Sequence, residues 1–212
     1  MDEHLHKVID LRINQCMKAL ERNGMKAYHA KTSEDVCKLL DEMIADGQHV
    51  SHGGSKTLKE LGVISYLEQR DIIFHAHGNP NAPKKETEED KMRAFFSDCF
   101  LASANAITLE GEIINMDGHG NRVSAMIYGP KKVIIIAGYN KIVADEEAAK
   151  VRIQQIAAPA NTIRLEKGTP CRTLGSCKDC HTKERICCSY VNLKYDRQDR
   201  IHVILVDESL GY

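Results

Sequence analysis

The chain has 212 residues, of which 42% are hydrophobic, and this suits one domain with a core built without disulfides. Its formal net charge of −1 and its lack of Trp argue against a nucleic-acid partner, and its N-terminus MDEHLHKVID has neither the basic start nor the apolar run of a signal peptide. Because the most hydrophobic run, Val133–Ala137, is too short to span a bilayer, we expect a cytoplasmic protein without a membrane partner.

Helices and strands are expected to alternate in the first half of the chain. Apolar residues recur there with helical period, and polar or Gly-containing turns separate the segments. In chain order we expect a helix over Leu5–Leu20 closed by Asn23-Gly24, a strand at Lys26–Ala30, a helix capped by Thr32 or Ser33, a strand at His49–Ser51, a helix opening at Thr57 with Glu60 at capping-box spacing, a strand at Ile72–Phe74 and a helix from about Glu86 to Leu101.

The centre of the chain is richer in strand signals. Gly, Asp and Pro turns separate four expected strands, at Ala106–Leu109, Glu112–Asn115, Arg122–Tyr128 and Val133–Ala137. An amphipathic helix over Asp145–Ile156, ended by Pro159, and a buried strand at Ile201–Val206 are expected to follow. The pattern predicts an α/β fold with a mixed sheet covered by helices, in one domain over residues 1–212 that includes a cysteine-rich loop at residues 169–190.

The stretch VSHGGSKTLKEL places two glycines between a strand and a helix start. Backbone N–H groups of Gly53, Gly54 and Ser55 at such a turn are suited to binding an anion or phosphate. The spacing is not that of a Walker A loop. A tight turn that needs glycine for its backbone angles explains the same residues equally well.

A second polar segment, NMDGHGNRV, is expected to form a turn between two strands. Turn chemistry accounts for its glycines but does not require Arg122 after Asn121, or the nearby acids Asp117 and Glu110. The planar fork of Arg122 could bind a carboxylate substrate. The alternative is an Arg122–Asp117 pair with a purely structural role.

The segment GYNKIV follows the apolar run VIIIA. Open α/β sheets bind ligands at the carboxyl ends of their strands, so Asn140 and Lys141 stand where a site is expected. A lone lysine at a strand end is weak evidence by itself.

Several other His and Cys residues are interpreted as structural. His75 and His77, in FHAHGN, have no carboxylate or Cys nearby at metal-site spacing, which favours a solvated loop pair over a metal site. Cys16, Cys37 and Cys99 stand alone among apolar positions and are interpreted as small buried side chains.

The remaining cysteines are clustered in TPCRTLGSCKDCHTKERICC. Cys171, Cys177, Cys180 and Cys187 have the spacing C-x5-C-x2-C-x6-C, and Cys188 is adjacent to the last of them. A C-x2-C turn with flanking cysteines can close a four-sulfur shell around zinc or hold an iron–sulfur cluster. We expect the four to converge on one metal centre, zinc before iron–sulfur, with Cys188 left out. A redox-active thiol pair and an unliganded loop are the alternatives.

Long segments of the chain resemble the LUD family, the lactate-utilization domain proteins. They are SHGGSKTLKELG, EGEIINMDGHGNRVSAMIYGPKKVIIIAGYNKIV, AAPANTIRL, the cysteine-rich segment and RIHVILVDESLGY. The resemblance implies a three-layer α/β/α fold with a mixed, mostly parallel sheet of the NagB/RpiA/CoA-transferase type, and a connection to oxidation of L-lactate to pyruvate. The family's motif positions map onto Gly53, Gly54, Ser55, Glu110, Asp117, Asn121, Arg122, Asn140 and Lys141.

These observations lead to one functional hypothesis. The protein would bind a small organic acid or phosphorylated metabolite, with Arg122 or Lys141 neutralising the anion and Glu110 or Asp117 as acid/base candidate. The chain has no GxGxxG fingerprint, so neither NAD nor FAD is expected. The rivals are a non-catalytic, metal-clipped subunit that docks on an iron–sulfur oxidoreductase, and a CoA-transferase or sugar-phosphate isomerase relative. A homo-oligomer is compatible with the sequence.

Overall fold

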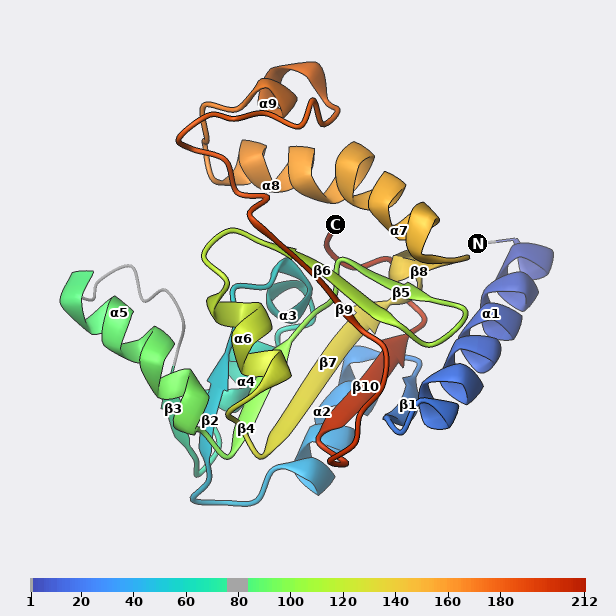
Figure 1. The fold of residues 1–212 in the computed structure, drawn as a ribbon. Helices are drawn as coiled ribbons and strands as arrows, with labels where there is room; N and C mark the ends of the chain where they lie inside the picture. Colours follow the sequence, from blue (N-terminus) through green and yellow to red (C-terminus); the bar gives the residue numbers. More distant parts are fainter. Residues whose placement is uncertain (1, 76–83) are drawn as a thin grey trace.

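The computed structural model describes residues 2–75 and 84–212, in which six strands form one parallel sheet (Figure 1). The strand order is β1-β10-β7-β4-β2-β3, and every neighbouring pair is parallel. The strands are β1 (Lys26–Ala30), β2 (His49–His52), β3 (Ile73–His75), β4 (Cys99–Ala102), β7 (Lys132–Gly138) and β10 (Ile201–Val206). Their carboxyl ends therefore meet at one edge of the sheet.

Helices cover both faces of this sheet. Their bounds are α1 (Glu3–Arg22), α2 (Ser33–Met43), α3 (Lys56–Glu60), α4 (Val63–Leu67), α5 (Lys84–Arg93), α6 (Asn121–Ile127), α7 (Glu146–Arg152), α8 (Ala158–Arg164) and α9 (Pro170–Leu174), with short turns η1 (Ala94–Phe96), η2 (Tyr139–Lys141) and η3 (Ile153–Ala157). Asp2, Thr32 and Asp145 cap α1, α2 and α7 through their side chains. No helix among the described residues is long and apolar enough to cross a bilayer.

The central strand β7 shows how the core is divided. Val133 and Ile135 pack in one hydrophobic cluster with α1 and α6, whereas Ile134 and Ile136 pack in a second cluster with α2, α3 and α4. Successive side chains of a strand point to opposite faces, so a strand covered on both faces is apolar throughout. The expected three-layer α/β/α architecture is confirmed.

The strand-rich centre forms a second, smaller sheet. Its order is β8-β5-β6-β9, in which β5 pairs parallel with β8 and antiparallel with β6, and β6 pairs antiparallel with β9. One face packs into the α1 cluster through Ile107 and Ile113, and the other packs under α7, η3 and α8 through Ala106 and Ile114. The strands are β5 (Ala106–Thr108), β6 (Ile113–Asp117), β8 (Ile142–Val143) and β9 (Ser189–Leu193). The smaller sheet thus supports the continuous helical segment α7–η3–α8 above the edge of the main sheet (Figure 1).

The helix expected from about Glu86 to Leu101 is wrong in its second half. Helix α5 ends at Arg93, and Cys99–Ala102 is strand β4, paired with β2 and β7. All four residues of β4 are buried. A short run that is buried on every side has no amphipathic period, so its apolar pattern does not separate helix from strand.

The strand expected at Arg122–Tyr128 is also wrong, because Asn121–Ile127 is helix α6. Gly120, with φ +80°, turns the chain sharply after β6, and the carboxylate of Asp117 accepts the backbone N–H of Val123 at 3.1 Å. This carboxylate satisfies a helix N–H that has no intrahelical partner, so a local cap outweighs the β-propensity of the segment.

Two helix boundaries differ from the prediction. Pro159 does not end the helix after Ile156, because the π-helical turn η3 precedes it and Pro159 occupies the first turn of α8, where its missing N–H is tolerated. Helix α3 is capped by Ser55, whose hydroxyl accepts the N–H of Leu58 at 3.2 Å, rather than opening at Thr57.

Candidate functional site

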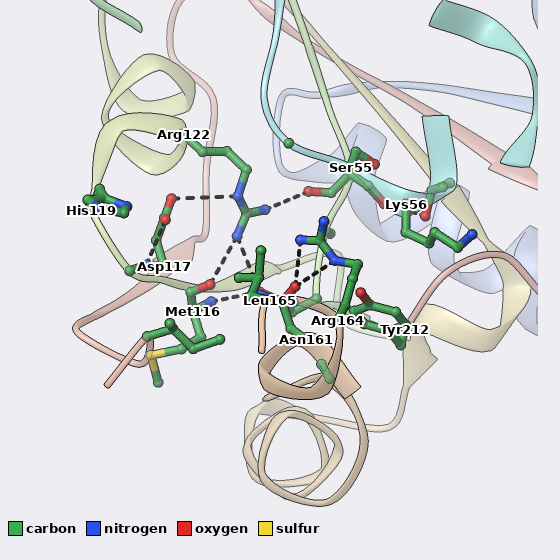
Figure 2. A pocket seen from close by; sticks show the side chains of 18 of the residues that line it. Ser55, Lys56, Met116, Asp117, His119, Arg122, Asn161, Arg164, Leu165 and Tyr212 are labelled. Carbon is green, nitrogen blue, oxygen red and sulfur yellow. Dashed lines mark hydrogen bonds and ion pairs between the residues drawn. The ribbon is translucent and has the colours of Figure 1, made fainter. Parts of the chain in front are cut away.

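A pocket of about 450 Å³ lies at the carboxyl edge of the main sheet. Its floor is formed by Gly54–Thr57 after β2, Ser103–Asn105 after β4 and Lys141 after β7. The turn between β6 and α6 closes one side, and α8 with the residues after it forms a roof (Figure 2). The structure therefore brings the three polar motifs of the sequence together where parallel strands end, the usual place for ligands in open α/β sheets.

Arg122 lies at the centre of the pocket floor and is held by the protein itself. Its Nε lies 3.5 Å from a carboxylate oxygen of Asp117, so the structural pair considered from the sequence is present (Figure 2). Burial lowers the pKa of Arg122, and the charge of Asp117 opposes that shift. The two terminal nitrogens donate to the backbone oxygens of Ser103 (2.8 Å) and Met116 (3.0 Å) and to the amide oxygens of Asn115 (2.7 Å) and Asn105 (3.3 Å).

All five N–H groups of Arg122 are therefore directed at protein acceptors. The guanidinium ties the loop after β4 to strand β6, and it lines the pocket. Gly53 lies behind this side chain, where an added Cβ would come within 3.0 Å of the Arg122 Cγ. Close approach of the Arg122 stem explains this glycine.

Lys141 is a lysine buried in the pocket wall, with 1% of its surface exposed. Its Nζ donates to the backbone oxygen of Tyr212, the residue that lines the pocket beside it. Burial lowers the pKa of Lys141 to about 7, and the nearby cations Arg152 and Arg122 contribute to the shift. The side chain of Lys141 therefore changes between its charged and neutral forms near neutral pH.

Three predicted site residues lie outside the pocket lining: Gly53, which stands behind Arg122, Asn140 and Glu110. The Asn140 side chain bonds to the backbone of Leu210 and Gly211, so it fastens the C-terminal segment beside Lys141. Glu110 lies in the turn between β5 and β6 and lines another concavity against α1. The structure does not bring Glu110 to the other candidates, which leaves Asp117 as the acidic side chain of the pocket.

Cations dominate the pocket lining. The described lining residues include six Lys or Arg residues and one acidic side chain, Asp117, in a chain whose formal net charge is −1. Three of the six cations have an acidic partner: Arg122 with Asp117, Lys56 with Glu60 at 3.5 Å and Lys91 with Glu88 at 2.7 Å. In the described part of the chain the other three have no acidic side chain as partner: Lys141, Arg164 and Lys167. The pocket therefore carries a local positive field.

Sequence patterns did not identify the roof of this pocket. Arg164 stands on α8 and donates to the Asn161 amide oxygen at 2.7 Å, while Lys167 follows that helix. Lys91 comes from α5 and His119 from the turn before α6. The one available signal was the basic run near the end of AAPANTIRLEK, which ordinary helix C-termini also carry.

The four predicted metal-binding cysteines line one small cavity of about 10 Å³. Cys188 is exposed and lies outside it. Their sulfur atoms are not drawn together as in a metal complex. Among the described residues, the group of potential ligand atoms that all lie within 4.8 Å of one another is that of His6, Asp10 and Asp207.

The cysteines and histidines interpreted as structural are partly accounted for. Cys16 and Cys99 are buried, as expected, and burial raises the pKa of each thiol to about 12. Cys37 is only half-buried. His75 stacks on His49, with ring centroids 5.5 Å apart, whereas His77 lies outside the described residues.

Comparison with known proteins identifies the family. A family model of the LUD domain matches residues 13–206. The chain belongs to the LUD domain family. In structure, this LUD domain resembles a DUF162 family protein from Deinococcus radiodurans with a TM-score of 0.55 and 14% identity, over 93% of this chain and 98% of that chain.

Two ribose 5-phosphate isomerases match the LUD domain in part. The enzyme from Plasmodium falciparum has a TM-score of 0.33 and 13% identity over 53% of this chain and 52% of that chain. The isomerase A from Neisseria gonorrhoeae has a TM-score of 0.35 and 11% identity over 66% and 69%. A search of curated protein sequences found no match to this chain.

Proposed function

We propose that the pocket binds a small anionic metabolite, an organic acid or a phosphate ester, in a role linked to oxidation of L-lactate to pyruvate. The observation that supports it is the excess of six cations over one acidic side chain on the lining of a chain with a net charge of −1. A concave site with one sign of charge concentrates counter-ions of the other sign. Membership of the LUD family, the lactate-utilization domain proteins, supports the proposed link to lactate.

The cations of the pocket would contribute to anion binding in different ways. Arg122 is saturated by protein acceptors, so it contributes its charge rather than a new pair of hydrogen bonds. Lys141 has a single hydrogen-bond partner in the described structure and two further N–H groups, which an anion would accept. Arg164 and Lys167 would then approach the same anion from the roof.

Lys141 is also the pocket group best suited to proton transfer. An acid/base catalyst works best when its pKa lies near the working pH, and burial holds the pKa of Lys141 at about 7. The carboxylate of Asp117 already accepts the backbone N–H groups of Gly118 at 2.7 Å and Val123 at 3.1 Å beside its pair with Arg122. Its acceptor positions are committed to the fold.

Calorimetric titration with L-lactate, pyruvate and inorganic phosphate tests this proposal. We expect at least one of them to bind the wild-type protein, and Lys141→Met to weaken its binding by roughly 10- to 100-fold, the loss of one charged hydrogen bond. Lys59→Met is the matched control, because Lys59 is exposed on α3 and does not line the pocket. Absence of binding by all three anions, or equal losses in both variants, would contradict the proposal.

A further inference from the structure

The segment from Cys171 to Cys188 folds almost without a core of its own. Cys171 is its single buried residue. Apart from the short helix α9, the segment is irregular, and it projects above α8 (Figure 1). A long irregular loop that buries so little apolar surface does not offset its conformational entropy by packing. Small elements of this kind are usually held by a disulfide or a metal.

The cysteines of this segment are gathered from separate parts of it. Cys171 comes from α9, Cys177 and Cys180 from the turn that follows, and Cys187 from the approach to β9. All four line the same small cavity. The cavity has a volume of about 10 Å³, and four cysteine thiolates are a ligand set of structural zinc sites.

Polar groups already surround these sulfurs. The backbone N–H of Asp179 donates to Cys177 Sγ at 3.3 Å, and the backbone at Asp179 has φ +45°, which bends the chain within the C-x2-C turn. The hydroxyls of Thr162 and Thr169 lie 3.4 Å and 3.3 Å from Cys171 Sγ. Hydrogen bonds of this kind orient ligands and stabilise thiolates in metal sites.

Arg185 holds the two remaining ligand segments in place. Its guanidinium donates to the backbone oxygens of Cys180 at 2.6 Å and Cys187 at 2.7 Å, and it pairs with Asp179 at 2.9 Å. The cation therefore fixes the backbone on both sides of the cavity. It also places a positive charge next to the site, which offsets part of the charge of four thiolates.

We propose that Cys171, Cys177, Cys180 and Cys187 bind one Zn²⁺ through four thiolates and that this ion fixes the loop over the pocket. Each thiol releases a proton as its sulfur binds the metal. In a tetrahedral site with Zn–S distances of about 2.3 Å the sulfurs stand about 3.8 Å apart, so binding draws them closer than the structure shows. A closed four-sulfur shell leaves no open position, which makes the role structural.

The loop is joined directly to the pocket. Ile186 lines both the cysteine cavity and the anion pocket, and the backbone N–H of Cys188 donates to the oxygen of Asp117 at 2.9 Å. Helix α8 contributes Thr162 to one cavity and Arg164 to the other. Zinc would therefore set the position of the roof, a consequence that rests on the proposed function.

Metal analysis and Co²⁺ spectroscopy test the site. Protein purified without oxygen and dialysed against Zn²⁺ should contain one zinc per chain, and Co²⁺ should give the visible absorption of a tetrahedral thiolate complex. Cys180→Ser should weaken Co²⁺ binding at least 100-fold, whereas Cys188→Ser, the neighbouring exposed cysteine, should leave it unchanged. Far-UV circular dichroism of both variants checks that the parallel-sheet domain is folded.

Three results would overturn the site. They are wild-type protein that binds no zinc, stoichiometric iron with sulfide in place of zinc, and equal losses of Co²⁺ binding in the two variants. Should Cys180→Ser fail to fold, the Co²⁺ spectrum and the zinc content of the wild-type protein decide the question alone.

The link to the pocket is tested by titrating inorganic phosphate into wild-type protein before and after a chelator removes zinc. We expect phosphate binding to weaken at least fivefold on zinc removal and to return when Zn²⁺ is restored. Unchanged binding would refute the link and leave the metal site standing. If neither form binds phosphate or the carboxylates, the proposed function fails, and zinc content still decides the metal site.

Discussion

The cations of the pocket floor and those of the roof differ in how many partners they have within the protein. The floor stands on strand ends that ladder hydrogen bonds fix, and its central cation, Arg122, has every N–H directed at a protein acceptor. The roof carries Arg164 on an exposed helical turn and Lys167 without a carboxylate partner in the described residues. In the floor, Arg122 is committed to the fold, whereas Lys141 keeps N–H groups that a ligand can use, as do the roof cations.

This difference predicts how substitutions will divide between folding and binding. Removing a floor cation changes the free energy of unfolding, because buried groups lose partners or lose a desolvated charge. Removing a roof cation changes ligand affinity and little else, since solvent replaces its contacts. The same chemical change, loss of one positive charge, should therefore have different effects on the two sides of the pocket.

The largest effect is expected for Arg122→Ala. The substitution leaves Asp117 without its cation and removes the hydrogen bonds that join the loop after β4 to strand β6. Breaking a buried pair of this kind destabilises a protein by about 3–5 kcal/mol. Urea unfolding followed by circular dichroism measures the loss. A loss below about 1 kcal/mol would show that Arg122 is available to a ligand, as the functional interpretation of the sequence proposed.

A smaller change of opposite sign is expected for Lys141→Met. Because the folded-state pKa of Lys141 lies at about 7 and its ordinary value is 10.5, the unfolded chain binds more protons between these limits. Stability of the wild-type protein should therefore rise with pH above 7. Replacing the lysine by an apolar side chain of similar length should stabilise the protein at pH 7 by about 1–3 kcal/mol.

Thermal unfolding of both proteins at pH 7 and pH 9 checks this sign. The advantage of Lys141→Met should shrink at pH 9, where the folded wild-type protein holds Lys141 uncharged. An advantage that is the same at both pH values would mean that the pKa of Lys141 is not depressed. A less stable variant would mean that the hydrogen bond to Tyr212 outweighs the desolvation of the ammonium group.

The strands and the place of the floor were predictable from the sequence because local signals and the final environment agree there. Lys26–Ala30 and Ile201–Val206 are strands with the predicted bounds. Gly54 and Lys141 meet because each follows a strand of the parallel sheet, whose strands end at one edge. Asp117 joins them from the end of β6, a strand of the smaller sheet. The rule that parallel strands end at one edge is enough to predict the place of the floor, and no side-chain contact has to be known.

The roof and the role of Arg122 were not predictable in this way. Four acceptors of the Arg122 guanidinium come from the loop after β4 and from β6, and only their packing makes them neighbours. Arg164 and Lys167 reach the pocket because the π-helical turn carries the helix past Pro159, where the sequence predicts an end. Neither the partners of Arg122 nor the continuation of the helix past Pro159 follows from the local sequence pattern.

The smallest effect, and the one most specific to the roof, is expected for Arg164→Ala. Because Arg164 is exposed and, among the described residues, its side chain bonds only to Asn161 one turn earlier, its loss should change the free energy of unfolding by less than about 0.5 kcal/mol. Loss of one partly solvated charge from the roof should weaken binding of phosphate or a carboxylate roughly three- to fivefold.

Arg197→Ala is the matched control for this change, since Arg197 is exposed and lies outside the pocket lining. Parallel calorimetric titrations of the two variants separate a local contact from an effect of net charge. An equal loss in both would show that the roof acts only through the overall field of the protein. A loss confined to Arg164→Ala, with unfolding unchanged, would show that α8 contacts the bound anion, as expected where cations have no acidic partner.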